Sequence, residues 1–201
     1  MGWKQGVFGI VVLAVLAAFP FLGRPLAVTI PTGTVVFVTP KVVDYRADVG
    51  ELLRHELSHA VLKRDRSMLN ILRMRRQPWV VEGVAGLVPE MAATAPGQPI
   101  ILPKEEFLLQ AKKEKLWPYF ADSAQRNWRF SYTAYIYFWN RQIERSGKET
   151  FLRFERACYS DPQACRGTFR SVYGTDLRSA VEDFQEEVLS GRLVTPRWVV
   201  F

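Results

Sequence analysis

Histidine and cysteine are scarce in this chain of 201 residues, which has only two of each: His55 and His59, Cys158 and Cys165. It also lacks internal repeats, low-complexity segments and any recognisable DNA- or RNA-binding motif. Nucleic acid is therefore a poor candidate partner, although the net charge is +7. Hydrophobic residues make up 48% and charged residues 23%, the balance expected of a globular protein with a real core.

The basic residues do not gather in one tail, and they are densest between Lys63 and Arg76. This stretch could contact anionic lipid or an acidic substrate. The simpler interpretation is a solvated surface that keeps the protein soluble.

The N-terminal segment differs from the rest of the chain, because residues 6–23 contain no charged side chain. These 18 residues follow Lys4 and are just long enough to span a bilayer as a helix. No good small-residue cleavage site follows, which favours an uncleaved anchor over a signal peptide. We therefore predict a transmembrane signal anchor over residues 1–24. Residues 25–201 would then be a periplasmic or otherwise extracytoplasmic domain held at the inner membrane, or secreted if the anchor is cleaved.

Cys158 and Cys165 enclose six residues, among them Asp161 and Pro162. This spacing suits a small disulfide-closed loop in an oxidising compartment. Two buried free thiols are the alternative. Metal binding by the pair is disfavoured, since no histidine or further cysteine lies nearby.

Hydrophobic periodicity divides the remaining chain into one extended segment and several helices. Residues 25–40 read as extended, with a strand over Thr34–Thr39. Apolar residues three and four apart then predict a helix from Val49 to Val61, and Pro78 opens a second one that runs to about Met91.

Later segments are predicted to be helical as well. They are a charged stretch over residues 104–128 and an aromatic helix over Ser131–Arg145 that Gly147 closes. Two more helices are expected over residues 148–158 and 175–190, the last between a Thr175 cap and a Gly191 stop.

The only two histidines stand in the sequence His55-Glu56-Leu57-Ser58-His59, inside the first predicted helix. Residues four apart project from one face of a helix, so both imidazoles can bind one tetrahedral metal ion. Glu56 would lie beside the metal, where it can accept a proton from water. The alternative is a helix with two incidental surface histidines.

A catalytic zinc site needs a third protein ligand and an open position for water. Glu82 is the one acidic residue at the start of an apolar helix, where an unpaired carboxylate would be costly. It is either a metal ligand or an exposed first-turn residue favoured by the helix dipole.

The histidine pair, followed by Trp79-Val80-Val81-Glu82-Gly83-Val84-Ala85, resembles the gluzincin metallopeptidases and most closely the peptidase MA-like family. In those families the glutamate of the second motif is the third zinc ligand, which corresponds to Glu82. The resemblance spans about residues 35–190, but only the two metal motifs are specific. It implies an α+β, mostly helical, zincin-like catalytic domain with a short N-terminal β element.

In related enzymes a tyrosine stabilises the oxyanion of the tetrahedral intermediate. The corresponding candidate is Tyr132, with Tyr135 in reserve, although both could be aromatic core residues. The Gly-rich motif that binds a substrate amine in the aminopeptidases has no counterpart here, which favours an endopeptidase.

The sequence thus predicts a membrane-anchored zinc metallopeptidase that holds one Zn²⁺ through His55, His59 and Glu82 and cleaves a peptide or protein with Glu56 as general base. A catalytically inactive zinc-binding scaffold and a basic membrane-surface adaptor are the alternatives. The substrate and the oligomeric state stay open.

Overall fold

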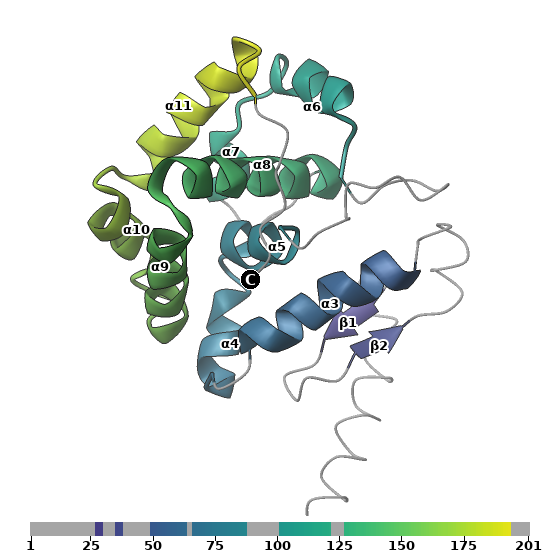
Figure 1. The fold of residues 1–201 in the computed structure, drawn as a ribbon, viewed down its shortest axis with the longest axis vertical. Coiled ribbons are helices and arrows are strands. Elements are labelled where there is room, and N and C mark those ends of the chain that lie inside the picture. Colours follow the sequence, from purple (N-terminus) through teal and green to yellow (C-terminus); the bar gives the residue numbers. More distant parts are fainter. Residues whose placement is uncertain are drawn as a thin grey trace, which may run out of the picture.

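The computed structural model describes residues 27–29, 35–37, 49–63, 66–87, 101–121 and 127–193. Most of them form helices (Figure 1): α3 Val49–Lys63, α4 Met68–Met74, α5 Pro78–Ala85, α6 Lys104–Ala111, α7 Trp117–Ala121, α8 Trp128–Ser146, α9 Lys148–Ser160, α10 Cys165–Tyr173 and α11 Leu177–Leu189. The two described strands, β1 Ala27–Thr29 and β2 Val35–Phe37, pair antiparallel with Val28 opposite Val36.

The predicted α+β class is wrong, because the described part of the chain is helical apart from this pair of three-residue strands. Of the strand predicted over Thr34–Thr39, the structure describes Val35–Phe37, which pairs with β1, and a two-stranded pair of this kind is marginal in water. Helices therefore supply the core. Within the described residues no helix is both long and apolar enough to cross a bilayer, and the predicted anchor, residues 1–24, lies outside them.

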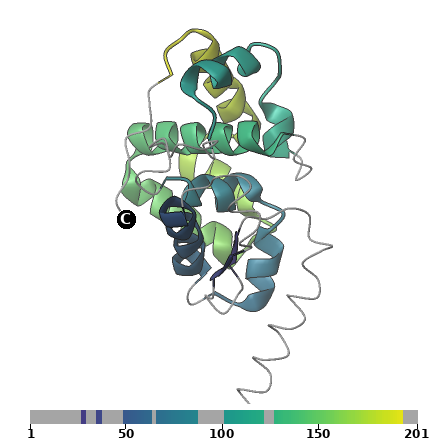
Figure 2. The same ribbon diagram turned by 90° about the vertical axis from the view of Figure 1, so that its right-hand side faces the viewer.

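Helix α8 organises the molecule. It crosses the middle of the fold, with α6 and α11 on one side and α3 and α5 on the other (Figures 1 and 2). Its aromatic side chains, including Tyr135, Phe138 and Trp139, are completely buried. A helix that is buried nearly all round over its middle turns must be covered by other helices on several sides.

The ends of the long helices follow ordinary capping chemistry. The Asn127 side chain accepts a hydrogen bond from the Phe130 N–H at 3.2 Å and begins α8. Gly147 ends it at φ 82°, as predicted.

Helix α11 is capped by Asp176, which accepts a hydrogen bond from the Ser179 N–H at 3.0 Å, and not by the predicted Thr175. Gly191, at φ 75°, follows its C-terminus.

The predicted disulfide is confirmed. Cys158 near the end of α9 is bonded to Cys165 at the start of α10, with the two Cα atoms 4.5 Å apart. Both residues are fully buried, and the Cys158 sulfur lies 3.9 Å from the Met74 sulfur of α4. The bridge thus fixes the turn between α9 and α10 where α4 packs on α9.

Candidate metal centre

His55 and His59 project from one face of α3, as their spacing requires. Their Nε2 atoms lie 3.1 Å apart, and the ring planes are nearly perpendicular, with an angle of 83°. Both side chains are buried, with exposed fractions of 6% and 5%. Two buried imidazoles that turn the same nitrogen towards one point are arranged as a pair of metal ligands would be.

Glu82 completes the group from α5. Its Oε2 lies 3.3 Å from the Nε2 of His55 and 3.3 Å from the Nε2 of His59. The three atoms form a nearly equilateral triangle, and the group could hold a metal ion. Glu82 is therefore not the exposed first-turn residue that the sequence allowed as an alternative, since only 20% of its side chain is accessible.

Burial acts to raise the pKa of the Glu82 carboxyl, but the two imidazoles more than offset it. The charge of His59 and hydrogen bonds from both rings hold this pKa well below its ordinary range. The carboxylate is thus ionised at neutral pH, which is the form that binds a cation.

The position of α5 explains why glycine follows Glu82. Gly83 faces α8, where an added Cβ would lie 2.9 Å from the Tyr135 Cβ and closer still to the Trp139 ring. A Cβ added at Gly86, three residues later, would likewise overlap the Ile136 side chain. Two glycines on one face therefore let α5 lie close against α8.

Trp79 fixes the start of α5 in the aromatic core. Its ring stacks on Trp139 with centroids 5.5 Å apart, and the Trp139 indole N–H donates to the Trp79 carbonyl at 2.7 Å. Trp79 itself donates to the Gln77 side chain at 2.9 Å. The Trp-x-x-Glu-Gly motif thus positions the carboxylate, because Trp79 and Gly83 hold α5 on α8 while Glu82 faces α3.

Glu56 lies beside this group without belonging to it. Its exposed fraction is 7%, close to that of the two histidines, and the ligand group found among the described residues does not include it. Glu56 follows His55 directly on α3, and its negative charge is one cause of the raised pKa of Tyr132. A buried carboxylate in this place along the helix agrees with the role of the predicted general base.

Tyr132 of α8 also faces the group. Its ring lies 6.4 Å from the His55 ring, at an interplanar angle of 30°. Burial, the negative charge of Glu82 and a hydrogen bond to that carboxylate raise the pKa of Tyr132 well above its usual range. The phenol therefore keeps its proton and can donate a hydrogen bond at this site.

Tyr135, the reserve candidate, lies elsewhere. It is completely buried, its hydroxyl donates to the Tyr119 carbonyl at 2.6 Å, and its ring packs edge-to-face on Phe120. With its hydroxyl already bonded inside the core, Tyr135 is a packing residue.

Trp128 also lies near the site, with its ring 5.8 Å from the Tyr132 ring and nearly perpendicular to it, and it was not predicted from the sequence. The signal was the spacing of four residues between Trp128 and Tyr132, which puts both on one face of a helix. The helix was predicted to begin only at Ser131, and this left Trp128 out.

No protein-family model, curated protein or solved structure matches the chain. The residues themselves therefore carry the functional assignment, and the likeness to the gluzincins stays a resemblance of two motifs.

Proposed function

We propose that this protein is a zinc-dependent metallopeptidase. The observation that supports it best is the convergence of His55, His59 and Glu82 on one point, with Glu56 buried one residue after His55 and Tyr132 facing Glu82. A scaffold that only binds metal would need neither the carboxylate nor the phenol.

The donor set favours zinc. Ligand atoms about 2.0–2.1 Å from a tetrahedral ion lie about 3.3 Å from one another, which agrees with the separations of 3.1–3.3 Å seen here. Two imidazoles and one carboxylate are also a ligand combination of catalytic zinc, and they leave a fourth position for water. When bound there, zinc would supply an activated water and polarise a carbonyl group.

Glu56 is assigned as the general base. It would accept a proton from the attacking water and pass it to the nitrogen that leaves the cleaved peptide bond. Burial suits this role, because bulk water then competes less for the carboxylate.

Tyr132 is assigned as the hydrogen-bond donor to the scissile carbonyl oxygen, which gains negative charge during attack. Its contact with Glu82 keeps the phenol oriented towards the ligand triangle. Peptides or proteins are the proposed substrates, with endopeptidase rather than aminopeptidase activity.

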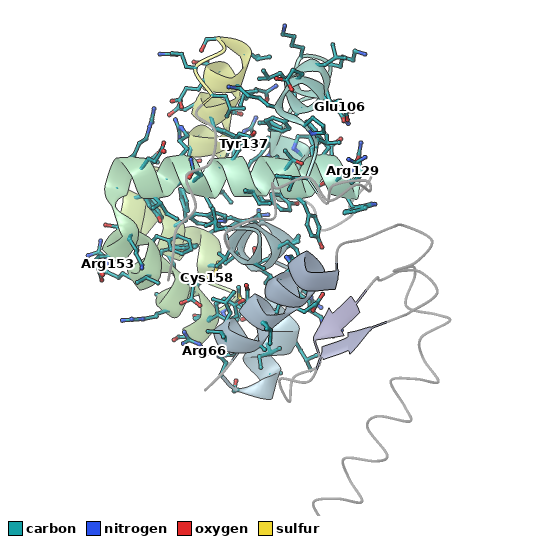
Figure 3. All side chains as sticks on the ribbon, turned by 45° about the vertical axis from the view of Figure 1, so that its right-hand side comes forward. Arg66, Glu106, Arg129, Tyr137, Arg153 and Cys158 are labelled. Atoms are coloured by element: carbon teal, nitrogen blue, oxygen red, sulfur yellow. A yellow bond between two sulfur atoms is a disulfide. The ribbon has the colours of Figure 1, made fainter. Side chains whose placement is uncertain are left out.

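The decisive experiment compares Glu56→Gln with the parent protein. The variant keeps the shape of the side chain but cannot act as a base, so hydrolysis of a casein or random-peptide substrate should fall by roughly a hundred- to ten-thousand-fold. Zinc content, measured by atomic absorption, should stay at one ion per chain. Glu106→Gln is the matched control, because Glu106 is exposed on α6, on the far side of α8 from α3 (Figure 3), and should change neither quantity.

Four other outcomes would change the assignment. Loss of zinc from Glu56→Gln would show that Glu56 is a ligand. Full activity in that variant would place the base elsewhere. A parent that binds zinc and cleaves nothing in a broad screen would favour the zinc-binding scaffold, and a parent without metal would favour an adaptor in which the motif is incidental.

A further inference from the structure

Trp128 stands out at the edge of the site because it is both large and exposed. Of its surface, 42% is accessible, and no other aromatic side chain in the described part of the chain is as open. The apolar side chains that follow it on α8 are buried, since Phe130 and Ala134 have no accessible surface. An exposed indole beside a proposed active site is typical of a surface that binds a ligand.

Trp128 is linked to the ligand triangle through the ring of Tyr132, which it contacts. Trp128 packs edge-to-face on Tyr132 at 5.8 Å, and Tyr132 lies 6.4 Å from the His55 ring. Both residues belong to the N-terminal end of α8, which Arg129 marks in Figure 3. A peptide that brings its carbonyl oxygen to Tyr132 must therefore pass beside Trp128.

We infer that Trp128 forms a specificity subsite, which binds an apolar side chain flanking the scissile bond of the substrate peptide. The inference rests on the proposed function and names the substrate class of the same site. The perpendicular contact with Tyr132 fixes the indole in place, so little side-chain entropy is lost when a substrate binds.

The surface that Trp128 offers is aromatic, because its indole and the Tyr132 ring pack edge to face. Burying such a surface favours an apolar side chain such as leucine or phenylalanine. A cationic side chain, which would bind an indole face through a cation–π contact, is the alternative that the test includes.

The test measures binding without hydrolysis. Zinc-loaded Glu56→Gln protein is titrated by calorimetry with blocked heptapeptides, acetyl-Gly-Ser-Ala-X-Ala-Ser-Gly-amide, in which X is Gly, Leu, Phe or Lys. Because burial of a large apolar side chain is worth about 1.5–3 kcal/mol when complete, the Leu and Phe peptides should bind at least tenfold more tightly than the Gly peptide.

A second substitution assigns the preference to Trp128. Adding Trp128→Ala should bring the Phe and Gly peptides to within about twofold of each other and leave the affinity of the Gly peptide and the zinc content unchanged. Trp128→Phe should keep part of the preference, since an aromatic face remains. Leu109→Ala on α6 is the matched control, because that residue is also exposed, at 58%, and should have no effect.

The outcomes separate this inference from the proposed function. A Trp128-dependent preference in a parent protein that cleaves none of the peptides would support the subsite and refute the peptidase. Cleavage with no preference, or a preference that survives Trp128→Ala, would overturn the subsite alone. Tightest binding of the Lys peptide would overturn the apolar assignment, and failure of every peptide to bind would overturn both.

Discussion

Tyr132 and Tyr135 show that the environment of a side chain determines its role. They stand three residues apart on α8, yet one hydroxyl interacts with Glu82 while the other donates to the Tyr119 carbonyl inside the core. The same residue type therefore has a catalytic assignment in one position and a structural one in the other.

Replacing each tyrosine with phenylalanine should separate these roles. Tyr132→Phe removes the proposed hydrogen bond to the developing oxyanion, so kcat should fall by about a hundred- to a thousand-fold while zinc content and KM change little. Tyr135→Phe removes the hydroxyl that donates to the buried Tyr119 carbonyl. It should lower the free energy of unfolding by about 1–3 kcal/mol in urea titrations with kcat nearly unchanged. The reverse pattern would exchange the two assignments.

Glu82 provides the second prediction at this scale. Glu82→Gln keeps the shape of the side chain but removes the charge that a cation needs. Zinc affinity, measured by competition with a chromogenic chelator, should weaken by more than the 10- to 100-fold that is typical of changes outside the ligand set. Because bound metal favours the folded state by mass action, zinc should then raise the melting temperature of the variant less than that of the parent. An unchanged affinity would remove Glu82 from the ligand set.

Among the elements, the contact between α5 and α8 controls the position of Glu82. Gly83 has no room for a Cβ beside Trp139 and Tyr135, whereas Gly167 on α10 has no atom within 4 Å of the place where a Cβ would stand. Two helical glycines thus experience opposite steric environments.

This difference predicts opposite effects of one substitution. Gly83→Ala should force α5 away from α8, lower stability by about 1–3 kcal/mol and weaken zinc binding, because Glu82 moves with its helix. Gly167→Ala should be neutral or stabilise the fold by up to about 1 kcal/mol, since alanine favours a helix and nothing blocks it. Thermal unfolding with and without zinc measures both. A Gly83→Ala protein that binds zinc as the parent does would separate the α5 contact from the metal site.

Helices with a clear apolar pattern or a marked start could be predicted from the sequence, and α4 could not. The periodicity of α3 and the aromatic run of α8 indicated both helices, and Pro78 marked the start of α5. Helix α4 was missed because only Ile71 and Met74 of its described side chains are buried, too few to form a pattern within seven residues.

Helix α10 was missed for a tertiary reason. It contains Gly167 and Thr168, which disfavour a helix, but the disulfide at Cys165 and the fully buried Phe169 hold it in place. Contacts of this kind cannot be predicted from local propensity. The end of α5 was also misplaced, since the helix was expected to reach Met91 and ends at Ala85, followed by a turn at Gly86 and Leu87.

The ligand set was easier to predict than the surroundings of the site. His55, Glu56 and His59 share one helix, so their spacing alone specifies their relative placement. Glu82 needed the resemblance, and the structure brings it to both imidazoles. The choice between Tyr132 and Tyr135 depends on how α8 is rotated against α3, which is a property of the packed core.

At the scale of the whole molecule, two links hold the C-terminal helices together. The Cys158–Cys165 bond joins α9 to α10, and Glu187 of α11 pairs with Arg141 and Arg145 of α8. Neither link touches the ligand triangle, so each can be removed to test stability apart from metal binding.

Removing the disulfide should cost stability and spare the site. Closing so short a loop reduces the entropy of the unfolded chain by an amount worth about 2.5 kcal/mol. A Cys158→Ala/Cys165→Ala protein should therefore melt at a lower temperature with zinc affinity unchanged. The reduced parent should melt at the same temperature as the variant. A parent whose melting temperature does not change when reductant is added would contradict the prediction.

The ion pairs of Glu187 predict that the free energy of unfolding depends on pH. Hydrogen bonding from Arg141 lowers the pKa of Glu187 despite partial burial. A carboxyl whose pKa is lower in the folded state contributes stability above its unfolded pKa, about 4.3, and loses it as the pH falls through the folded value. The difference in unfolding free energy between the parent and Glu187→Gln should thus be largest at pH 7 and shrink below about pH 4. A difference that is constant with pH would show that this carboxyl does not carry the effect.

The spacing of the ligands along the chain has a consequence for the order of folding. His55, His59 and Glu82 fall within 28 consecutive residues, whereas Tyr132 comes 50 residues after Glu82. The loop between the ligands is short and costs little entropy to close, but Glu82 takes its position only when α5 packs on α8. We therefore expect metal uptake to wait for α8, and stopped-flow refolding with a zinc indicator should show uptake no earlier than the fluorescence change of the buried tryptophans. During synthesis the chain would stay without its ion until α8 has been made, and an unfinished protein could not cut its neighbours.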